Sequence, residues 1–286
     1  MLLNASGCLD ALTAPETVAQ LDAFVTKTVT PEPRPGNDPP RIAETEFGML
    51  NSIGLANPGR EAFLADHLPR LRELGLPLWV SVGGFSADDY ADTCSCLDGI
   101  AVIELNLSCP NVDEAPESAA EIVAACRAAT DLPLYAKLSP SAWDVAEVAR
   151  AVEIAGADGL SLVNTARGLA LDERTLRPRL SRGAGGYSGP ALKPIALAAV
   201  HACFRATNLP IVGMGGVRSG LDALELIACG ASAVALGTVL FADPDAPSRI
   251  RSELAEEAAA RGFSTPEEAR GIAHPGVVRA EYTAPR

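Results

Sequence analysis

Short apolar runs alternate with longer segments of helical period along this chain, and the alternation recurs eight times. Turn residues bound each apolar run, which is typical of strands. The runs predict strands at residues 2–6, 24–29, 77–82, 100–107, 133–138, 159–164, 210–215 and 232–237. The longer segments predict helices near residues 14–22, 60–74, 87–97, 117–130, 141–155, 191–206, 219–229 and 246–261. Ser141 and Ser219 are the expected N-caps of two of these helices.

Eight strand-then-helix units with no boundary between them favour a closed (β/α)8 barrel, the TIM barrel, over an open sheet. Strands that are apolar throughout suit a parallel sheet covered on both faces. A doubly wound sheet would usually show GxGxxG after an early strand, but the glycine clusters here come late, at 183–189 and 213–216. The 286 residues are enough for one barrel of about 250 residues. We therefore expect a single α/β domain over residues 1–286.

Two stretches do not fit a minimal barrel. Residues 30–58 follow the second strand and are too rich in Pro and Asn for a helix, and residues 165–189 follow the sixth strand with little apolar content. Long loops at the carboxyl ends of barrel strands commonly carry active sites. Both are therefore predicted active-site loops, although a loop of this length could also be a dimer contact. The tail, residues 262–286, contains one short capped helix.

Charge and cysteine content restrict the function classes. Lys and Arg number 23 against 36 Asp and Glu, a net charge of −13 that repels phosphate backbones and disfavours nucleic-acid binding. Seven scattered cysteines suit a reducing compartment, and the CxC at Cys94 and Cys96 has no second pair that would favour a metal site. The start lacks signal-peptide features, and no apolar run approaches the roughly 18 residues of a membrane span. We expect a cytoplasmic protein that binds neither membrane nor metal.

Two lysines, Lys27 and Lys137, lie inside otherwise apolar strands. A buried ammonium group is costly unless an anion or several acceptors meet it. Each lysine could pair with a neighbouring Asp or Glu. If both face one cavity, they favour an anionic ligand there.

Glycine-containing turns end the seventh and eighth strands, at 213–216 and 237–238. Phosphate groups of barrel ligands commonly bind at these strand ends, where backbone N–H groups can approach the anion. Tight turns alone would explain either motif. Their position at both strands favours a phosphate-bearing ligand.

Cys109 follows the fourth strand within the string NLSCPN. A single cysteine is most often an inert buried side chain. This one lies on a loop between Asn106 and Asn111, with Pro110 fixing the turn, so it can face a cavity. A thiol there could act as a general base or as a nucleophile.

Asparagines are frequent near the strand ends, whereas histidines are not. The asparagines favour a planar ligand rich in amide donors and acceptors, and they are Asn51, Asn106, Asn111 and Asn164. The three histidines, His67, His201 and His274, fall in helices or in the tail. Their positions disfavour a His-dependent hydrolase and a His-ligated metal site.

With these residues in place, the sequence resembles the dihydroorotate dehydrogenases, FMN-dependent barrel enzymes of pyrimidine synthesis. The resemblance covers most of residues 3–243. It rests on NASG (4–7), TKTVTPEPRPGNDPPRIAETEFGMLNSIGLANPG (26–59), IELNLSCPN (103–111), PLYAKLSP (133–140), GADGLSLVNT (156–165), GGYSGPALKPIAL (185–197), PIVGMGGV (210–217) and GASAVALGT (230–238).

The resemblance implies roles for particular residues. The implied FMN contacts are Ser6, Lys27, Thr28, Asn106, Lys137, Val163, Gly189, Gly215, Gly216, Gly237 and Thr238. The implied dihydroorotate contacts are Lys27, Asn51, Ile53, Gly54, Leu55, Asn106, Asn111, Asn164 and Thr165. Cys109 matches the catalytic base, which removes a proton from C5 of dihydroorotate while a hydride passes from C6 to the flavin. Lys137 matches the residue that stabilises negative charge on the reduced flavin.

The resemblance also indicates the class. The membrane-associated class carries Ser at the position of Cys109, so Cys109 indicates the soluble classes. The strings ETEFGMLNSIGLANPG and GGYSGPALKP are more similar to the NAD-linked class than to the fumarate-linked one. A homodimer and a second subunit carrying FAD and a [2Fe–2S] cluster are then the expected partners, since this chain has no iron–sulfur cysteine spacing. NAD is the first expected acceptor and fumarate the second.

Three departures from the family pattern leave alternatives open. The chain starts almost at NASG, the segment after it is short, and the loop after NLSCPN is shorter than is usual in the family. One alternative is a related flavin barrel that reduces another pyrimidine, such as uracil or a tRNA uridine. The other is a catalytically impaired FMN-binding subunit.

Overall fold

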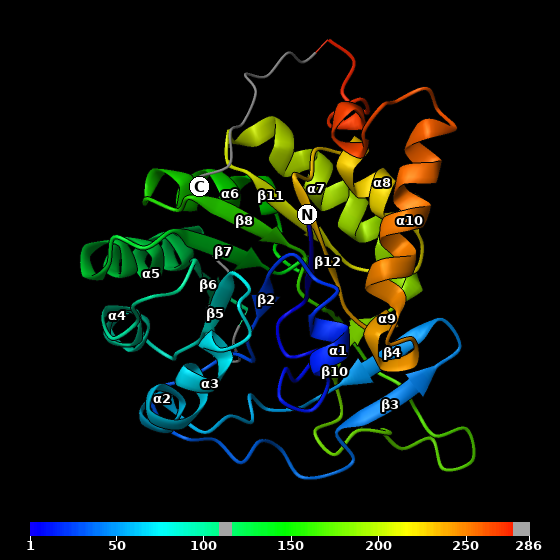
Figure 1. The fold of residues 1–286 in the computed structure, drawn as a ribbon. Helices are drawn as coiled ribbons and strands as arrows, with labels where there is room; N and C mark the ends of the chain where they lie inside the picture. Colours follow the sequence, from blue (N-terminus) through cyan, green and yellow to red (C-terminus); the bar gives the residue numbers. More distant parts are fainter. Residues whose placement is uncertain (109–115, 277–286) are drawn as a thin grey trace.

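Eight parallel strands form a closed (β/α)8 barrel in the part of the chain described here, residues 1–108 and 116–276 of a computed structural model (Figure 1). The order around the sheet is β1 (Leu2–Asn4), β12 (Ala233–Leu236), β11 (Ile211–Met214), β8 (Gly159–Leu162), β7 (Leu134–Leu138), β6 (Val102–Asn106), β5 (Leu78–Val82) and β2 (Phe24–Val25). A parallel bridge between Leu3 and Ala23 joins β1 to the start of β2 and closes the sheet. The predicted fold is confirmed, and each of the eight strands lies within its predicted range.

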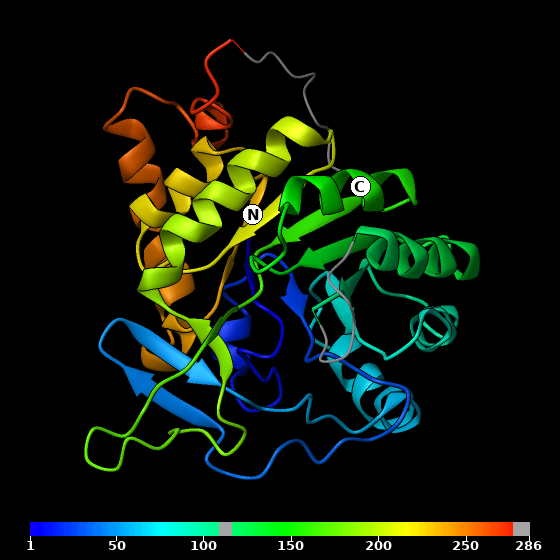
Figure 2. The same ribbon diagram turned by 180° about the vertical axis from the view of Figure 1, so that it is seen from behind.

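Helices surround the barrel strands (Figures 1 and 2). They are α1 (Pro15–Val18), α2 (Arg60–Ala62), α3 (Leu68–Arg72), α4 (Ala87–Ser95), α5 (Pro116–Ala129), α6 (Val145–Ile154), α7 (Lys193–Ala206), α8 (Gly220–Ala228), α9 (Val239–Ala242) and α10 (Ala246–Ala259). The short helix predicted in the tail is a 3-10 turn at Pro266–Ala269. Among the described helices, none has the length and apolar character needed to cross a bilayer.

The structure corrects two local predictions about helices. Ser141 is not an N-cap, because α6 begins at Val145 and the Asp144 carboxylate accepts from the amides of Ala146 and Glu147 at 2.9 and 3.1 Å. Ser219 does cap α8, as predicted.

The helix predicted at 60–74 is divided by a π-helical turn, Phe63–His67, just before Pro69. Proline has no N–H to continue the regular hydrogen-bond ladder, which accounts for the interruption.

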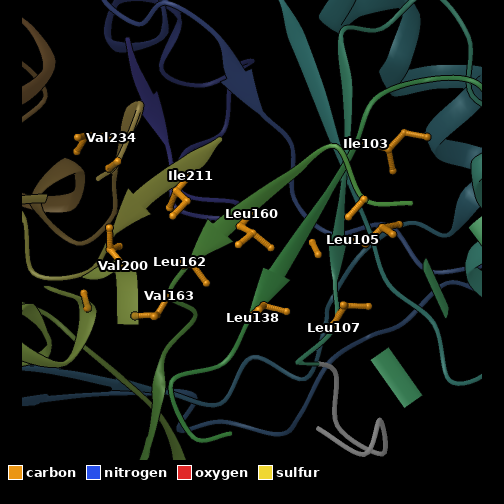
Figure 3. Packing of buried hydrophobic residues seen from close by; sticks show 14 of the residues in the cluster. Ile103, Leu105, Leu107, Leu138, Leu160, Leu162, Val163, Val200, Ile211 and Val234 are labelled. Carbon is orange, nitrogen blue, oxygen red and sulfur yellow. The ribbon is translucent and has the colours of Figure 1, made fainter. Parts of the chain in front are cut away.

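The strand side chains divide into two apolar cores with a period of two. On β7, Leu134, Ala136 and Leu138 pack with the helices, whereas Tyr135 belongs to a second cluster. Figure 3 shows the labelled side chains of the first cluster between strands and helices. The buried members of the second cluster all come from the barrel strands or directly beside them, so they fill the barrel interior.

The two predicted loops pair with each other in an antiparallel sheet, which the sequence did not predict. Within the described residues its order is β3 (Ile42–Thr45), β4 (Gly48–Asn51), β10 (Gly185–Ser188) and β9 (Ala166–Gly168). We call it the cap sheet. Figures 1 and 2 show the β3–β4 hairpin and β10 at the opposite end of the barrel from the 3-10 turn of the tail. Strands of three or four residues, rich in glycine, carry too little periodicity to be recognised along the sequence.

Candidate active site

The carboxyl ends of the barrel strands and the cap sheet enclose a cavity of about 950 Å³. Each implied FMN contact lines it, namely Ser6, Lys27, Thr28, Asn106, Lys137, Val163, Gly189, Gly215, Gly216, Gly237 and Thr238. The implied dihydroorotate contacts Asn51, Ile53, Gly54, Leu55, Asn164 and Thr165 line the same cavity, as do Lys27 and Asn106. The structure therefore brings together every described residue of both predicted sets.

The predicted base Cys109 and the predicted substrate contact Asn111 lie outside the described residues. Ser108, the residue before Cys109, lines the cavity. Its hydroxyl oxygen is buried, and among the described residues it has no hydrogen-bond partner. A buried hydroxyl without a partner is costly, so this group is available to a bound ligand.

The period of two in the strands explains why these side chains meet. Tyr135 belongs to the interior cluster, and Lys137, two residues later on β7, lines the cavity. Asn106 follows Val102 by four residues on the same face of β6, and Lys27 follows Val25 by two residues. Inward positions that are apolar near the amino ends become polar or small at the carboxyl ends. The interior core therefore supports the floor of the cavity.

A chain of hydrogen bonds fixes the polar floor. The Asn164 amide donates to the Asn106 carboxamide oxygen at 3.1 Å, and the Asn106 amide donates to the Thr28 hydroxyl at 3.2 Å. Thr28 in turn shares a hydrogen bond with Ser81 at 3.0 Å. Four barrel strands are linked in this way, so the two asparagines are held in defined rotamers with donors and acceptors along the floor.

Lys137 forms a buried ion pair beneath the cavity. Its ammonium group lies 3.3 Å from the Glu104 carboxylate and donates to the Ser6 hydroxyl at 2.8 Å. The side chains of Lys137 and Glu104 are only 5% and 2% exposed. Lys137 therefore has a carboxylate partner and also lines the cavity, so both possibilities that its sequence position raised are realised.

The cavity wall itself is cationic. Among the described lining residues there is no Asp or Glu, whereas Lys27, Lys137, Arg167 and Arg182 all contribute. This concentration of positive charge contrasts with the net charge of −13 of the whole chain. An anionic ligand is therefore favoured in the cavity despite the acidic surface.

The turn after β11 depends on glycine. Gly215 and Gly216 have φ of 122° and 76°, and a Cβ at Gly216 would lie 2.7 Å from the backbone nitrogen of Lys193. Lys193 bonds Asp222 and Glu225 of α8 at 2.6 Å each. Burial alone would raise the pKa of the Asp222 carboxyl, but the hydrogen bonds from Lys193 and the Arg218 amide hold that pKa below its ordinary value. This ion pair braces the turn.

Gly237, after β12, has a different role. A Cβ there would meet only Ala5 and the Cys8 sulfur, each at 3.9 Å. The space in front of this glycine therefore belongs to the cavity rather than to protein atoms. A cradle of this kind suits the close approach of a ligand to the backbone.

The sequence analysis missed several lining residues, including Cys8, Asn37, Arg167 and Arg182. Burial raises the pKa of the Cys8 thiol, although Lys137 and Lys27 act in the opposite direction. Cys8 directly follows the NASG string, which could have identified it. The position of Asn37 and the arginines depends on how the cap sheet folds, and no local pattern in the sequence specifies it.

The histidines lie elsewhere, as their sequence positions predicted. His67 is in the π-helical turn and His201 is in α7, where it stacks on His274 of the tail with ring centroids 4.0 Å apart. None of the described residues that line the cavity is a histidine. Within residues 1–108 and 116–276, no group of three or more His, Cys, Asp or Glu side chains is arranged to hold a metal ion.

Comparison with known proteins decides the family. The family model described as dihydroorotate dehydrogenase matches residues 1–258. The chain belongs to the dihydroorotate dehydrogenase family. Among similar proteins, the dihydroorotate dehydrogenase B (NAD(+)) catalytic subunit of Listeria monocytogenes is 44% identical over 256 residues, 86% of this chain and 84% of that protein. The protein of the same name from Latilactobacillus sakei is 47% identical over 251 residues, 84% of this chain and 82% of that one.

A solved dihydroorotate dehydrogenase shares the fold. The crystal structure of the Eimeria tenella protein in complex with ferulenol matches with a TM-score of 0.79 and 23% sequence identity. The match covers 96% of this chain and 85% of that one. At this identity the likeness supports the barrel fold and nothing more detailed.

Proposed function

We propose that this dihydroorotate dehydrogenase uses FMN to oxidise (S)-dihydroorotate to orotate in pyrimidine biosynthesis. The observation that carries the proposal is the convergence of both implied residue sets, from seven of the eight barrel strand ends and two distant segments, on one cationic cavity. Family membership also supports the reaction.

The cavity fits FMN at its phosphate end. The open space before Gly237 and the turn at Gly215 and Gly216 lie at the ends of β12 and β11 and would hold the phosphate. Lys137, Asn106 and Thr28 would bind the polar edge of the ring system from the floor. When bound, FMN supplies an acceptor for the hydride that leaves C6 of the substrate.

Dihydroorotate is a six-membered ring with amide N–H and C=O groups, tetrahedral carbons at C5 and C6, and a carboxylate. Asn106 and Asn164 are preorganised by their mutual hydrogen bond and can match amide donors and acceptors of such a ring. Lys27 and Asn51 also line the cavity, and Lys27 supplies a cation for the carboxylate. The cap sheet covers this region and helps to exclude water from the reacting atoms.

We propose that Cys109 is the base. Its thiolate takes the proton from C5 while C6 loses a hydride, and the electron pair of the C5–H bond forms the C5–C6 double bond of orotate. Glu104 and Ser6 hold the Lys137 ammonium group at the cavity wall. This fixed cation favours the transfer of negative charge away from the substrate.

The partners follow from the class. We propose a single barrel domain that acts in the cytoplasm as a homodimer with an electron-transfer subunit carrying FAD and a [2Fe–2S] cluster. The similarity to proteins named NAD(+)-linked catalytic subunits supports such a partner. NAD would then be the final acceptor.

An anaerobic titration with dihydroorotate tests the reaction. The visible absorbance of bound oxidised flavin should bleach in the wild-type protein. In Cys109→Ala the flavin should remain bound but be reduced about 10²- to 10⁴-fold more slowly, the usual contribution of a general base. A wild-type flavin that dihydroorotate leaves oxidised would overturn the substrate assignment, and reoxidation of the chemically reduced flavin by uracil would favour the alternative pyrimidine. A normal rate in Cys109→Ala would overturn the assignment of the base.

A further inference from the structure

Two arginines of the cavity have no role in the reaction proposed above. Arg167 lies on β9 and Arg182 lies between β9 and β10, and both line the cavity while remaining exposed to solvent. Within the described residues, Arg167 has no hydrogen bond or ion pair of its side chain. Long cationic side chains at an opening, without an anionic partner, are poorly explained by a structural role.

Arg167 is in line with a residue of the implied substrate site. The strand registers pair Ile42 with Asn51, Asn51 with Gly186, and Gly186 with Arg167, so the four residues form one row across the cap sheet. All four line the cavity, which identifies the face that the row presents. Two strand spacings, about 10 Å, separate Arg167 from Asn51. Gly186 has no side chain, and the side chain of Thr165, another implied substrate contact, occupies the position that a Cβ there would take.

Arg182 is connected to the same region through Asn37. Its guanidinium Nε donates to the Asn37 side-chain oxygen at 3.4 Å. The Asn37 amide donates to the Ser52 hydroxyl at 2.9 Å, and Ser52 directly precedes the implied substrate contacts Ile53, Gly54 and Leu55. Within the described residues this long bond to Asn37 is the only side-chain hydrogen bond of Arg182, so its two terminal nitrogens have no partner there.

The electrostatic setting gives these arginines a task. An anion that approaches a chain of net charge −13 is repelled, and the repulsion must be reversed locally before the anion reaches the buried lysines. Exposed charges act over about 8 Å at physiological ionic strength. Arg167 and Arg182 lie at the opening of a cavity whose described lining has no carboxylate. Their charges can therefore reverse the repulsion locally.

We propose that Arg167 and Arg182 form a cationic entrance that attracts the anionic substrate, and releases the anionic product more slowly, without taking part in the chemical step. The proposal rests on the proposed function, because it assumes a carboxylate-bearing substrate. It assigns a determinant of affinity to the cap sheet, separate from the barrel residues.

The test is anaerobic single-turnover reduction of the FMN-loaded protein over a range of dihydroorotate concentrations. In Arg167→Gln/Arg182→Gln the limiting reduction rate should be retained, while the rate at low substrate should fall about 3- to 10-fold at low ionic strength. The difference should shrink in high salt, because screening removes the effect from both proteins. Arg167→Lys/Arg182→Lys should stay close to wild type. Arg174→Gln is the matched control, since Arg174 is exposed on the same segment but does not line the cavity.

Ligand binding to the oxidised protein gives a second readout. Orotate, an anion, should bind the double Gln variant more weakly by a similar factor, whereas uracil, which lacks the carboxylate, should be unaffected. The entrance is disproved if the double Gln variant matches wild type, if Arg174→Gln has the same effect, or if the loss persists in high salt. A wild-type flavin that dihydroorotate cannot reduce would instead disprove the proposed function, and the two failures are therefore distinguishable.

Discussion

The barrel sheet and the cap sheet face the same cavity but are built differently. The barrel strands are buried on both faces, between an interior core and the helices. The cap sheet has only a small core of its own, in which Ala43, Leu50 and Leu180 pack on the side away from the cavity. The barrel therefore fixes its polar residues in a rigid network, whereas the cap sheet supplies exposed side chains at the opening.

The barrel sheet and the cap sheet therefore carry different kinds of functional residue. Groups that must keep their geometry during the reaction, such as Lys137 and Asn106, lie on barrel strands with buried partners. Groups that meet the ligand on its way in, such as Arg167, lie on short exposed strands. Rigid elements give precise sites, and less stable elements tolerate motion.

The largest expected effect tests the rigidity of the barrel. Glu104→Gln leaves the buried Lys137 ammonium without an anion and should lower the free energy of unfolding by about 3–5 kcal/mol. Glu225→Gln is the control, because Glu225 is a more exposed partner of Lys193 and should cost less than about 1 kcal/mol. Urea denaturation at a fixed excess of FMN measures both. Adding Lys137→Met to Glu104→Gln should recover part of the loss, and equal losses in the two single variants would contradict the role of burial.

The second comparison truncates one leucine in each sheet. Leu160 on β8 and Leu50 on β4 are both almost fully buried. Leu160→Ala should cost about 3–4 kcal/mol and Leu50→Ala about 2–3 kcal/mol, since the smaller cap core can collapse around the missing atoms. Hydrogen exchange should show that Leu50→Ala weakens protection mainly in the cap sheet. A loss spread evenly over the barrel would mean that the two sheets unfold as one unit.

Adding a methyl group at Gly186 and at Gly237 should change different properties of the protein. A Cβ at Gly186 of the cap sheet would overlap with the Thr165 side chain, so Gly186→Ala should destabilise the protein by about 1–3 kcal/mol. A Cβ at Gly237 overlaps with nothing, so Gly237→Ala should fold normally yet bind FMN more weakly. Thermal unfolding and flavin titration separate the two effects. Unchanged FMN affinity in Gly237→Ala would show that the cradle is not used.

The smallest expected effect concerns pH. The pKa of Asp222 is lowered in the folded state, so its stabilising contribution is present above the ordinary Asp pKa and is lost as the pH falls through the lowered value. Asp222→Asn should therefore cost about 1–2 kcal/mol at neutral pH, and the difference from wild type should narrow below about pH 4. Urea midpoints measured from pH 3 to 7 check this. A difference that does not change with pH would exclude the carboxylate charge as the cause.

Local sequence patterns were sufficient to predict the barrel and to place many of the residues that line the cavity. Lys137 and Asn106 could be placed there because both lie in predicted strands, and parallel strands bring their carboxyl ends to one edge. The family motifs added the specific roles. The sequence-based prediction was wrong where two nearby residues could each cap the same helix, since Asp144 caps α6 in place of Ser141.

By itself, then, the sequence determined the barrel, the residues at its strand ends and the family, because these depend on short-range periodicity and on contiguous motifs. Only the tertiary structure decided that Glu104 is the partner of Lys137 and that segments 30–58 and 165–189 pair as one sheet. Asn51 and Gly186 are 135 residues apart, and the Asn51 amide reaches the Gly186 carbonyl because the barrel places the two segments side by side. The position of Arg167 beside the implied substrate site follows from that pairing. No local preference of the chain encodes it.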